Sequence, residues 1–306
     1  MFKTTMVSLF ERLFFKPTPL DWALIFLFSP LSFLYAFYML FRRILTPKKS
    51  YAVPIVSIGN LTVGGSGKTP FVIALAARYE HAFIISRGYG RESKGLIEVS
   101  RNGKILTDVF TSGDEPMLMA TSLKHASVIV SDNREIAIEL AIKEGAKVIF
   151  LDDGFNRVNI KKYEILLFPE KIPNCMSFPA GPFREFFFSK AFSNINLYEN
   201  RDFTRVVNIH NQREKMLLVT AISNPARLEP FLPIGVIEKL YFEDHAYFSE
   251  DELKEKLLIS GALSLLITEK DEVKMKGFKL PLSIMQLELQ IKNEIFEEID
   301  NYIGAY

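Results

Sequence analysis

Hydrophobic residues along this chain gather in short β-rich runs that alternate with stretches of helical spacing. Four runs have the length and composition of buried strands: YAVPIVSI (51–58), AFIISR (82–87), SVIVSD (127–132) and KVIFLDD (147–153). Two stretches between them, 69–80 and 134–146, repeat apolar residues at the intervals of a helix face. This alternation predicts a parallel sheet whose ligand site lies at the carboxyl ends of the strands.

A second α/β pattern follows after residue 165. Its expected strands are 216–222, 239–244 and 263–268, and its expected helices lie near 224–232, 249–259 and 291–304. Residues 169–190 are rich in Pro and Phe and are typical of a loop or lid. We therefore expect one α/β domain over 46–165 and a smaller one over 166–306, and leave open whether the final helix packs back on the first.

The most apolar stretch of the chain, LDWALIFLFSPLSFLYAFYMLF (20–41), carries Asp21 as its single charge and is long enough to cross a bilayer core. Arg42 and Arg43 follow it directly, which favours a cytoplasmic carboxyl side. Pro30 allows a kinked helix that enters one leaflet only. Residues 1–45 are thus expected to form a membrane-associated helix. A helix packed on the protein itself is the alternative, and spanning versus interfacial insertion stays open.

Composition narrows the classes of partner. Lys and Arg number 37 against 36 Asp and Glu, a net charge of +1, so no field favours nucleic acid. The one cysteine, Cys175, excludes an internal disulfide framework and a cysteine-rich zinc site. No obligate protein partner is evident.

Candidate chemistry begins with NLTVGGSGKTP (60–70), which lies between an expected strand and an expected helix. The strict phosphate-loop pattern G-x-x-x-x-G-K-[ST] requires glycine where this chain has Thr62. The glycines still turn backbone N–H groups toward an anion, and Lys68 would reach the β- and γ-phosphates. The expected ATP contacts are Thr62, Val63, Gly64, Gly65, Ser66, Gly67, Lys68 and Thr69. Val63 replaces the partner-reaching lysine of ATPases that sandwich as dimers, which disfavours that class.

LDDGF (151–155) places Asp152 and Asp153 at the end of a buried run. A carboxylate at a strand end opposite a phosphate loop suits Mg²⁺, although Asp and Gly also make turns on their own. The pairing with the loop favours the metal: we assign Thr69 and Asp152 to Mg²⁺, and Lys68 and Asp153 to catalysis. Which aspartate touches the ion directly stays open. The expected fold is a P-loop NTPase-type parallel sheet with a second, smaller α/β domain and an N-terminal hydrophobic membrane helix.

With these motifs in order, the chain resembles the tetraacyldisaccharide 4′-kinase family, the lipid A 4′-kinases of Gram-negative envelopes. The matching blocks are PIVSIGNLTVGGSGKTP (54–70), ISRGYGR (85–91), SGDEP (112–116), LDDGF (151–155), FPAGPFRE (178–185), SNPAR (223–227), FEDH (242–245) and ITEKD (267–271). The resemblance implies phosphorylation of the 4′-hydroxyl of tetraacyldisaccharide 1-phosphate, dependent on ATP and Mg²⁺. It also implies attachment to the inner membrane at its cytoplasmic face, through the N-terminal helix.

The resemblance also assigns roles that the residues alone do not. Asp114 matches the family's proposed base and His245 its partner, whereas by itself Asp114-Glu115-Pro116 indicates only the start of a helix. The family pattern places six residues near the substrate or the transferring phosphate: Arg87, Tyr89, Arg91, Glu115, Arg184 and Glu185.

This chain departs from the family pattern at two positions. Ala246 stands where a second histidine is usual, and Asn156 stands where glutamine is usual. His245 must therefore act without a neighbour that could replace it, and any contact made by the glutamine amide is in doubt. Thr268 to Asp271 match the family without a derivable chemical role, so we expect hinge or fold-supporting hydrogen bonds there.

Two other classes compete with a kinase. A membrane-bound P-loop NTPase switch that recruits partners would be expected to carry a guanine-specifying motif such as N-K-x-D, and none follows a strand here. A membrane scaffold with a decayed nucleotide site is disfavoured because Lys68, Thr69 and Asp152 are intact.

Overall fold

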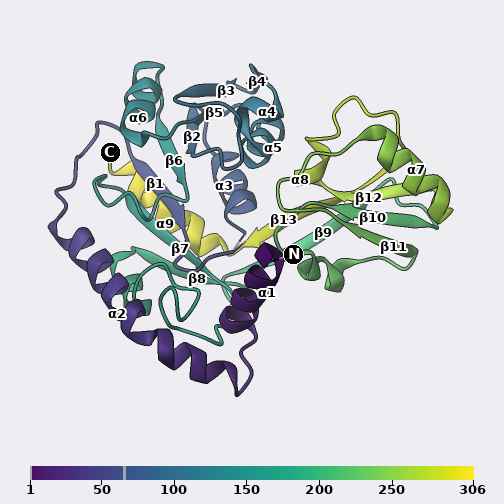
Figure 1. Ribbon diagram of the computed structural model, residues 1–306. Helices are drawn as coiled ribbons and strands as arrows, with labels where there is room; N and C mark the ends of the chain where they lie inside the picture. Colours follow the sequence, from purple (N-terminus) through teal and green to yellow (C-terminus); the bar gives the residue numbers. More distant parts are fainter. Residues whose placement is uncertain (1, 65–66) are drawn as a thin grey trace.

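Two β-sheets form the frame of the computed structural model, which describes residues 2–64 and 67–306 (Figure 1). The larger sheet has the strand order β4-β3-β5-β2-β6-β1-β7-β8. Its strands are β1 Ile55–Gly59, β2 Ala82–Ser86, β3 Ile97–Arg101, β4 Lys104–Ile105, β5 Ser127–Val130, β6 Val148–Asp152, β7 Tyr163–Phe168 and β8 Ile195–Tyr198. The smaller sheet has the order β11-β10-β12-β13-β9. Its strands are β9 Phe203–His210, β10 Met216–Thr220, β11 Val236–Tyr241, β12 Ser264–Thr268 and β13 Leu282–Ile291.

Helices surround both sheets (Figure 1). The α-helices are α1 Phe2–Phe15, α2 Asp21–Leu45, α3 Lys68–Ala76, α4 Val109–Ser112, α5 Asp114–Ser122, α6 Arg134–Lys143, α7 Glu250–Ser260, α8 Glu269–Glu272 and α9 Asn293–Gly304. Two 3₁₀ helices, η1 and η2, span Phe187–Phe192 and Pro225–Phe231. The second of these lies where the sequence predicted an α-helix, and Pro230 inside it accounts for the difference because proline cannot donate a helical hydrogen bond.

The predicted α/β class is confirmed. In the larger sheet, β5, β2, β6, β1, β7 and β8 are all parallel, and every residue of β1, β2, β5, β6 and β7 is buried. Burial on both faces is why these strands are continuous apolar runs in the sequence. Helices α3, α5 and α9 contribute to the core on one face of the sheet, and α6 covers the other.

The sheets do not divide at the predicted boundary between residues 165 and 166, which falls inside β7. Strand β8 also belongs to the larger sheet, so residues up to Tyr198 continue the first domain. The chain enters the second sheet at β9 and leaves it after β13 (Figure 1). Helix α9 then returns to the first domain, where Ile295 and Ile299 complete the core. The second domain, 203–291, is therefore an insertion.

Helix α2 lies along the outside of the first domain, beside α1 (Figure 1). Among the large residues that it leaves exposed are Trp22, Phe26, Leu27, Leu34, Tyr38 and Phe41. By length and composition it could cross a membrane. One basic residue after the apolar run differs from expectation: Arg43 is buried against the protein and forms an ion pair with Glu185, with nitrogen–oxygen distances of 2.6 and 2.8 Å.

Candidate active site

The phosphate loop follows β1 and precedes α3, which is the strand–loop–helix order that the sequence predicted. Gly64 and Gly67 have φ angles of 96° and 81°, a region that favours glycine. Lys68 and Thr69 form the first turn of α3. The Lys68 ammonium donates to Oδ1 of Asn60 at 3.0 Å, so the amide of Asn60 holds the lysine over the loop. The expected ATP contacts Gly65 and Ser66 lie outside the described residues.

The first residues of the loop are tied to the Pro- and Phe-rich segment. The backbone N–H of Val63 donates to the carbonyl of Pro182 at 2.9 Å, and that of Arg184 donates to the carbonyl of Leu61 at 2.7 Å. Thr62 is buried and pairs with Phe183 in an isolated β-bridge. These contacts align the segment antiparallel to the loop. They bring Arg184 to the phosphate site, and they give Thr62 and Val63 a supporting place in the loop.

The carboxylate of Asp153 lies close to the ammonium of Lys68. Oδ1 of Asp153 lies 3.5 Å from the Lys68 ammonium, and Oδ2 of Asp153 accepts from Arg184 at 2.9 Å. Burial by itself would raise the pKa of Asp153, but the charges of Lys68 and Arg184 outweigh it and lower that pKa. Asp153 therefore stays ionised between two cations that both suit phosphate oxygens.

Asp152 ends β6 and is buried beside this group. Its Oδ2 accepts from the hydroxyl of Ser86 at 2.9 Å, while its Oδ1 is buried without a hydrogen-bond partner among the described residues. Burial, with the neighbouring charges of Glu115 and Asp153, raises the pKa of Asp152 to about 6. An unpartnered, buried carboxylate oxygen beside a phosphate loop fits Mg²⁺, which proteins commonly hold with one or two carboxylates plus substrate phosphates.

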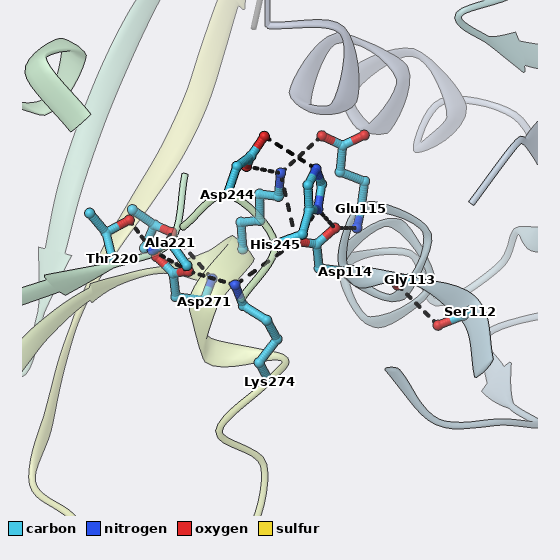
Figure 2. Close-up of polar contacts among 12 residues, drawn as sticks. Ser112, Gly113, Asp114, Glu115, Thr220, Ala221, Asp244, His245, Asp271 and Lys274 are labelled. Atoms are coloured by element: carbon cyan, nitrogen blue, oxygen red, sulfur yellow. Dashed lines mark hydrogen bonds and ion pairs between the residues drawn. The ribbon is translucent and has the colours of Figure 1, made fainter. Parts of the chain in front are cut away.

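Asp114 and His245 come together from different domains (Figure 2). Asp114 is the first residue of α5 in the larger-sheet domain, and His245 follows β11 in the inserted domain. Nδ1 of His245 lies 2.9 and 2.8 Å from the two carboxylate oxygens of Asp114. The structure thus brings together the two residues that the family pattern pairs, 131 residues apart in the chain.

Two lysines complete the surroundings of Asp114, and sequence reasoning gave neither a role. The ammonium groups of Lys270 and Lys274 lie 3.7 and 3.9 Å from Oδ2 of Asp114. Burial alone would raise the pKa of Asp114, but the hydrogen bond with His245 and the charges of the lysines together lower it. Lys270 also pairs with Glu115 at 3.1 Å and so joins the domains a second time. Its place in the motif ITEKD was the one available signal.

Asp271, next in that motif, supports the fold as expected. It accepts from the Thr220 hydroxyl at 2.7 Å and from the backbone N–H of Ala221 at 3.2 Å, and it pairs with Lys274 at 3.0 Å (Figure 2). These contacts tie α8 to the end of β10. They fix the lysine that faces Asp114.

In the loop after β2, some side chains lie near the Asp114–His245 pair and others stabilise the loop itself. Tyr89 is exposed, and its ring centre lies 5.1 Å from that of His245, so it borders the dyad. Arg87 is also exposed at the strand end. Arg91 differs from the prediction: its guanidinium donates to the carbonyl of Gly95 at 2.7 Å and to Asp132 at 3.0 Å, and only 4% of the side chain is exposed. It braces its loop and is not placed to contact substrate.

Glu185 also departs from its predicted contact with substrate. Both carboxylate oxygens face Arg43 of α2, and the side chain is 1% exposed. Its motif lies beside the phosphate loop, but Arg43 neutralises the charge of Glu185 inside the protein. Of the two departures from the family pattern, Asn156 accepts from Arg42 through its backbone carbonyl at 3.1 Å, and Ala246 packs against the core of the second domain.

Comparison with known proteins gives one consistent result. The model of the family "Tetraacyldisaccharide-1-P 4′-kinase" matches residues 24–202 and 190–304. Tetraacyldisaccharide 4′-kinase of Helicobacter acinonychis is 46% identical over 298 residues, which cover 97% of this chain and 95% of the relative. That of Aliarcobacter butzleri is 44% identical, covering 97% of each chain. The crystal structure of LpxK from Aquifex aeolicus in complex with ATP is similar with a TM-score of 0.77 at 27% identity, over 92% of this chain and 99% of that one.

Proposed function

Because the chain belongs to the tetraacyldisaccharide-1-P 4′-kinase family, we infer that the phosphate loop binds the donor ATP and that the Asp114–His245 pair activates the lipid acceptor. The chain is an ATP-dependent kinase that phosphorylates the 4′-hydroxyl of tetraacyldisaccharide 1-phosphate in lipid A biosynthesis. What remains to be assigned is the role of each residue.

The donor side is built to position and neutralise a phosphoryl group. Lys68 and Arg184 flank Asp153 and supply cationic donors for the β- and γ-phosphate oxygens. Asp152 and Thr69 are the residues that would hold Mg²⁺, which neutralises phosphate charge when bound. With that cation nearby, Asp152 works as a carboxylate although burial favours its neutral form.

The acceptor side is built to take a proton. Asp114 is ionised at neutral pH because its lowered pKa leaves it negatively charged. Nδ1 of His245 donates to it and fixes its orientation. Asp114 receives the proton of the 4′-hydroxyl as that oxygen attacks the γ-phosphorus of ATP and the bond from this phosphorus to the bridging oxygen of ADP breaks. Lys270 and Lys274 stabilise the carboxylate until transfer. Tyr89 borders the place where the sugar must lie.

The observation that carries this proposal is the carboxylate–imidazole contact between Asp114 and His245, at 2.8 Å, in a hollow lined by Tyr89, Gly90, Tyr247 and Lys274. The test uses purified protein in detergent with labelled ATP, Mg²⁺ and the disaccharide 1-phosphate lipid. We expect label in the lipid from the wild type and almost none from Asp114→Asn, at unchanged ATP affinity. Loss of ATP binding in the variant would make Asp114 a nucleotide ligand instead.

We also propose that α2 anchors the enzyme to the cytoplasmic face of the inner membrane. Four acyl chains hold the acceptor in a bilayer, so the enzyme must work at its surface. The exposed apolar side chains of α2, together with the exposed Phe188 and Phe192 of η1, give the first domain a surface suited to lipid.

The anchor is better tested by substitution than by deletion, because deletion would also remove Arg43 from Glu185. We expect Phe26→Glu with Leu34→Glu to reduce sedimentation with anionic vesicles and to leave ATP affinity unchanged. The matched control is Ile234→Glu, which alters a fully exposed apolar residue of the second domain. Equal sedimentation of the double variant and the wild type would contradict an anchor in α2.

A further inference from the structure

The first residues of strand β9 in the inserted domain contact helix α3, which follows the phosphate loop. The rings of Phe203 and Phe71 meet edge to face with centres 5.9 Å apart. Phe203 and Arg205 point to the same face of β9, because strand side chains alternate. Gly67 lies one helical turn before Phe71, and the Phe71 N–H donates to its carbonyl at 3.2 Å.

This alignment brings the guanidinium of Arg205 to the first turn of α3. Its Nη2 lies 3.1 Å from the point that a β-carbon on Gly67 would occupy, and its Nη1 lies 3.9 Å from the same point. The guanidinium thus lies against the backbone of Gly67, where the phosphate loop has no side chain. The side chain of Arg205 is 14% exposed, so it is held there and not extended into solvent.

Within the described residues, Glu199 binds the guanidinium of Arg205 on one edge and leaves the other edge free. Glu199 accepts from its Nε at 2.5 Å and from its Nη2 at 3.3 Å, while no partner for Nη1 lies in the described part of the chain. A helix N-terminus carries partial positive charge, and Lys68 adds a full one. The free edge of the guanidinium and the helix N-terminus therefore present positive charge to the same point, which favours binding of a polyphosphate there.

We propose that Arg205 is a nucleotide-binding residue that reaches from the inserted domain to the α- and β-phosphates, with Glu199 holding its guanidinium in place. This rests on the proposed binding of ATP at the phosphate loop. The first turn of α3 faces the α- and β-phosphates and Lys68 reaches further, to the β- and γ-phosphates. The nucleotide is then held by both domains, and its binding is coupled to their relative position.

The test is nucleotide binding by calorimetry with the full-length protein in detergent, without lipid acceptor. We expect Arg205→Met to weaken ATP and ADP alike, by roughly ten- to a hundredfold, because one charge-assisted contact to both is lost. Arg205→Lys should fall between the variant and the wild type. The matched control is Arg201→Met, which changes an exposed arginine two residues before β9 that pairs with Asp202, and it should leave both affinities unchanged.

A second variant separates phosphate contact from support of the fold. In Arg205→Met with Glu199→Gln, no carboxylate is left unpaired, so affinity should stay as low as in Arg205→Met alone. Recovery of affinity in the double variant, or wild-type ADP affinity in the single one, would overturn the proposal. A lower affinity for ATP with unchanged affinity for ADP would also overturn the proposal, since that result would place Arg205 at the γ-phosphate. Because ADP binding needs no acceptor, absent lipid phosphorylation would sink the proposed function and leave this inference standing.

Discussion

His245 adopts a left-handed backbone conformation, with a φ of 63°, and this decides how its role can be tested. Asparagine tolerates that region far better than alanine or a β-branched residue, so His245→Asn removes the imidazole with little backbone strain. Asp114 sits at the start of α5 after Gly113, whose φ is 88°, and Asp114→Asn keeps its shape. These two substitutions therefore remove the catalytic groups with little change to the backbone.

We expect Asp114→Asn to lower kcat by roughly a hundred- to ten-thousandfold, the range for removal of a general base. His245→Asn should lower it less, because the carboxylate remains. The dissociation constant for ATP should stay unchanged in both. Single-turnover phosphorylation and equilibrium ATP binding measure the two quantities. Equal loss of ATP binding and of turnover would contradict an acceptor-side role for this pair.

Asp152 gives a pH-dependent prediction. Its pKa is raised from 3.8 to about 6 in the folded protein, so burying its charge destabilises the fold progressively as pH rises from about 4 to about 6, and the loss persists above that. Without Mg²⁺, Asp152→Asn should therefore be more stable than the wild type at pH 7.5, by at most about 3 kcal/mol, and the gap should close toward pH 4.

The measurement is urea unfolding in detergent at a series of pH values, with and without Mg²⁺ and ADP. Mg²⁺-dependent stabilisation of the wild type should weaken as pH falls through about 6 and should be absent in Asp152→Asn. A variant that still gains stability from Mg²⁺ would move the metal to another residue.

The residues of the site differed in how far the sequence predicted them. Lys68 was assigned from its motif, because a phosphate loop is a local pattern. Asp114 and His245 needed the family resemblance, since a helix start and a lone histidine have no local mark of catalysis. Glu185 was assigned to substrate because its motif matches the family pattern. Its partner Arg43 is 142 residues away, and no local pattern reveals such a pair.

At the scale of elements, that Arg43–Glu185 pair connects α2 to the segment that lines the phosphate loop. Arg43 also donates to the carbonyl of Phe155 at 3.1 Å and stacks on its ring, 3.8 Å from the centre. Through Arg43, α2 therefore contacts Phe155, which follows Asp153 and Gly154 in the chain.

We expect Arg43→Met to destabilise the fold by roughly 3–5 kcal/mol, because it leaves the Glu185 carboxylate buried without a partner. Adding Glu185→Leu should recover most of that loss, since an apolar pair of similar volume can replace a buried ion pair. Denaturant unfolding of the single and double variants tests this. Arg101→Met, which breaks an exposed pair with Glu98, is the control and should change nothing measurable. A double variant as unstable as the single one would show that the arginine acts through packing instead.

Among the elements, the buried parallel strands β1, β2, β5 and β6 were predicted, whereas the equally buried β7 and the antiparallel pair β9–β13 were not. The parallel strands are apolar throughout because both faces are covered. In β13, LSIMQLELQI, and in β9, FTRVVNIH, polar residues interrupt the pattern because one face stays partly open to solvent. Their pairing joins residues 203–210 to 284–291, a separation that no local signal spans.

At the scale of the whole molecule, the two domains meet through charges around Asp114. Lys270 contacts carboxylates of both domains: Glu115 and Asp114 lie in the first domain, and Asp244 lies in its own. Burial opposes its charge, but these carboxylates raise the pKa of Lys270, so it stays protonated. The arrangement couples domain position to the acidity of Asp114.

We expect Lys270→Met to raise the pKa of Asp114, because a cation that lowers it is removed. The acid limb of the kcat/KM profile should move to higher pH, since Asp114 must be ionised to accept a proton. Amide exchange at residues 114–117 and 243–247 should also become faster as the domains separate more often. Lys276→Met, an exposed lysine of the same segment, is the control. An unmoved acid limb would contradict the coupling.

The return of α9 to the first domain has a consequence for synthesis of the chain on the ribosome. Ile295 and Ile299 belong to the same core as Phe71, Val56 and Ile165. The nucleotide-binding core therefore lacks part of its apolar contacts until α9 has left the exit tunnel, while the inserted domain, complete at residue 291, is available to fold earlier. A chain interrupted before α9 would lack these core contacts, although every residue of the phosphate site had been made.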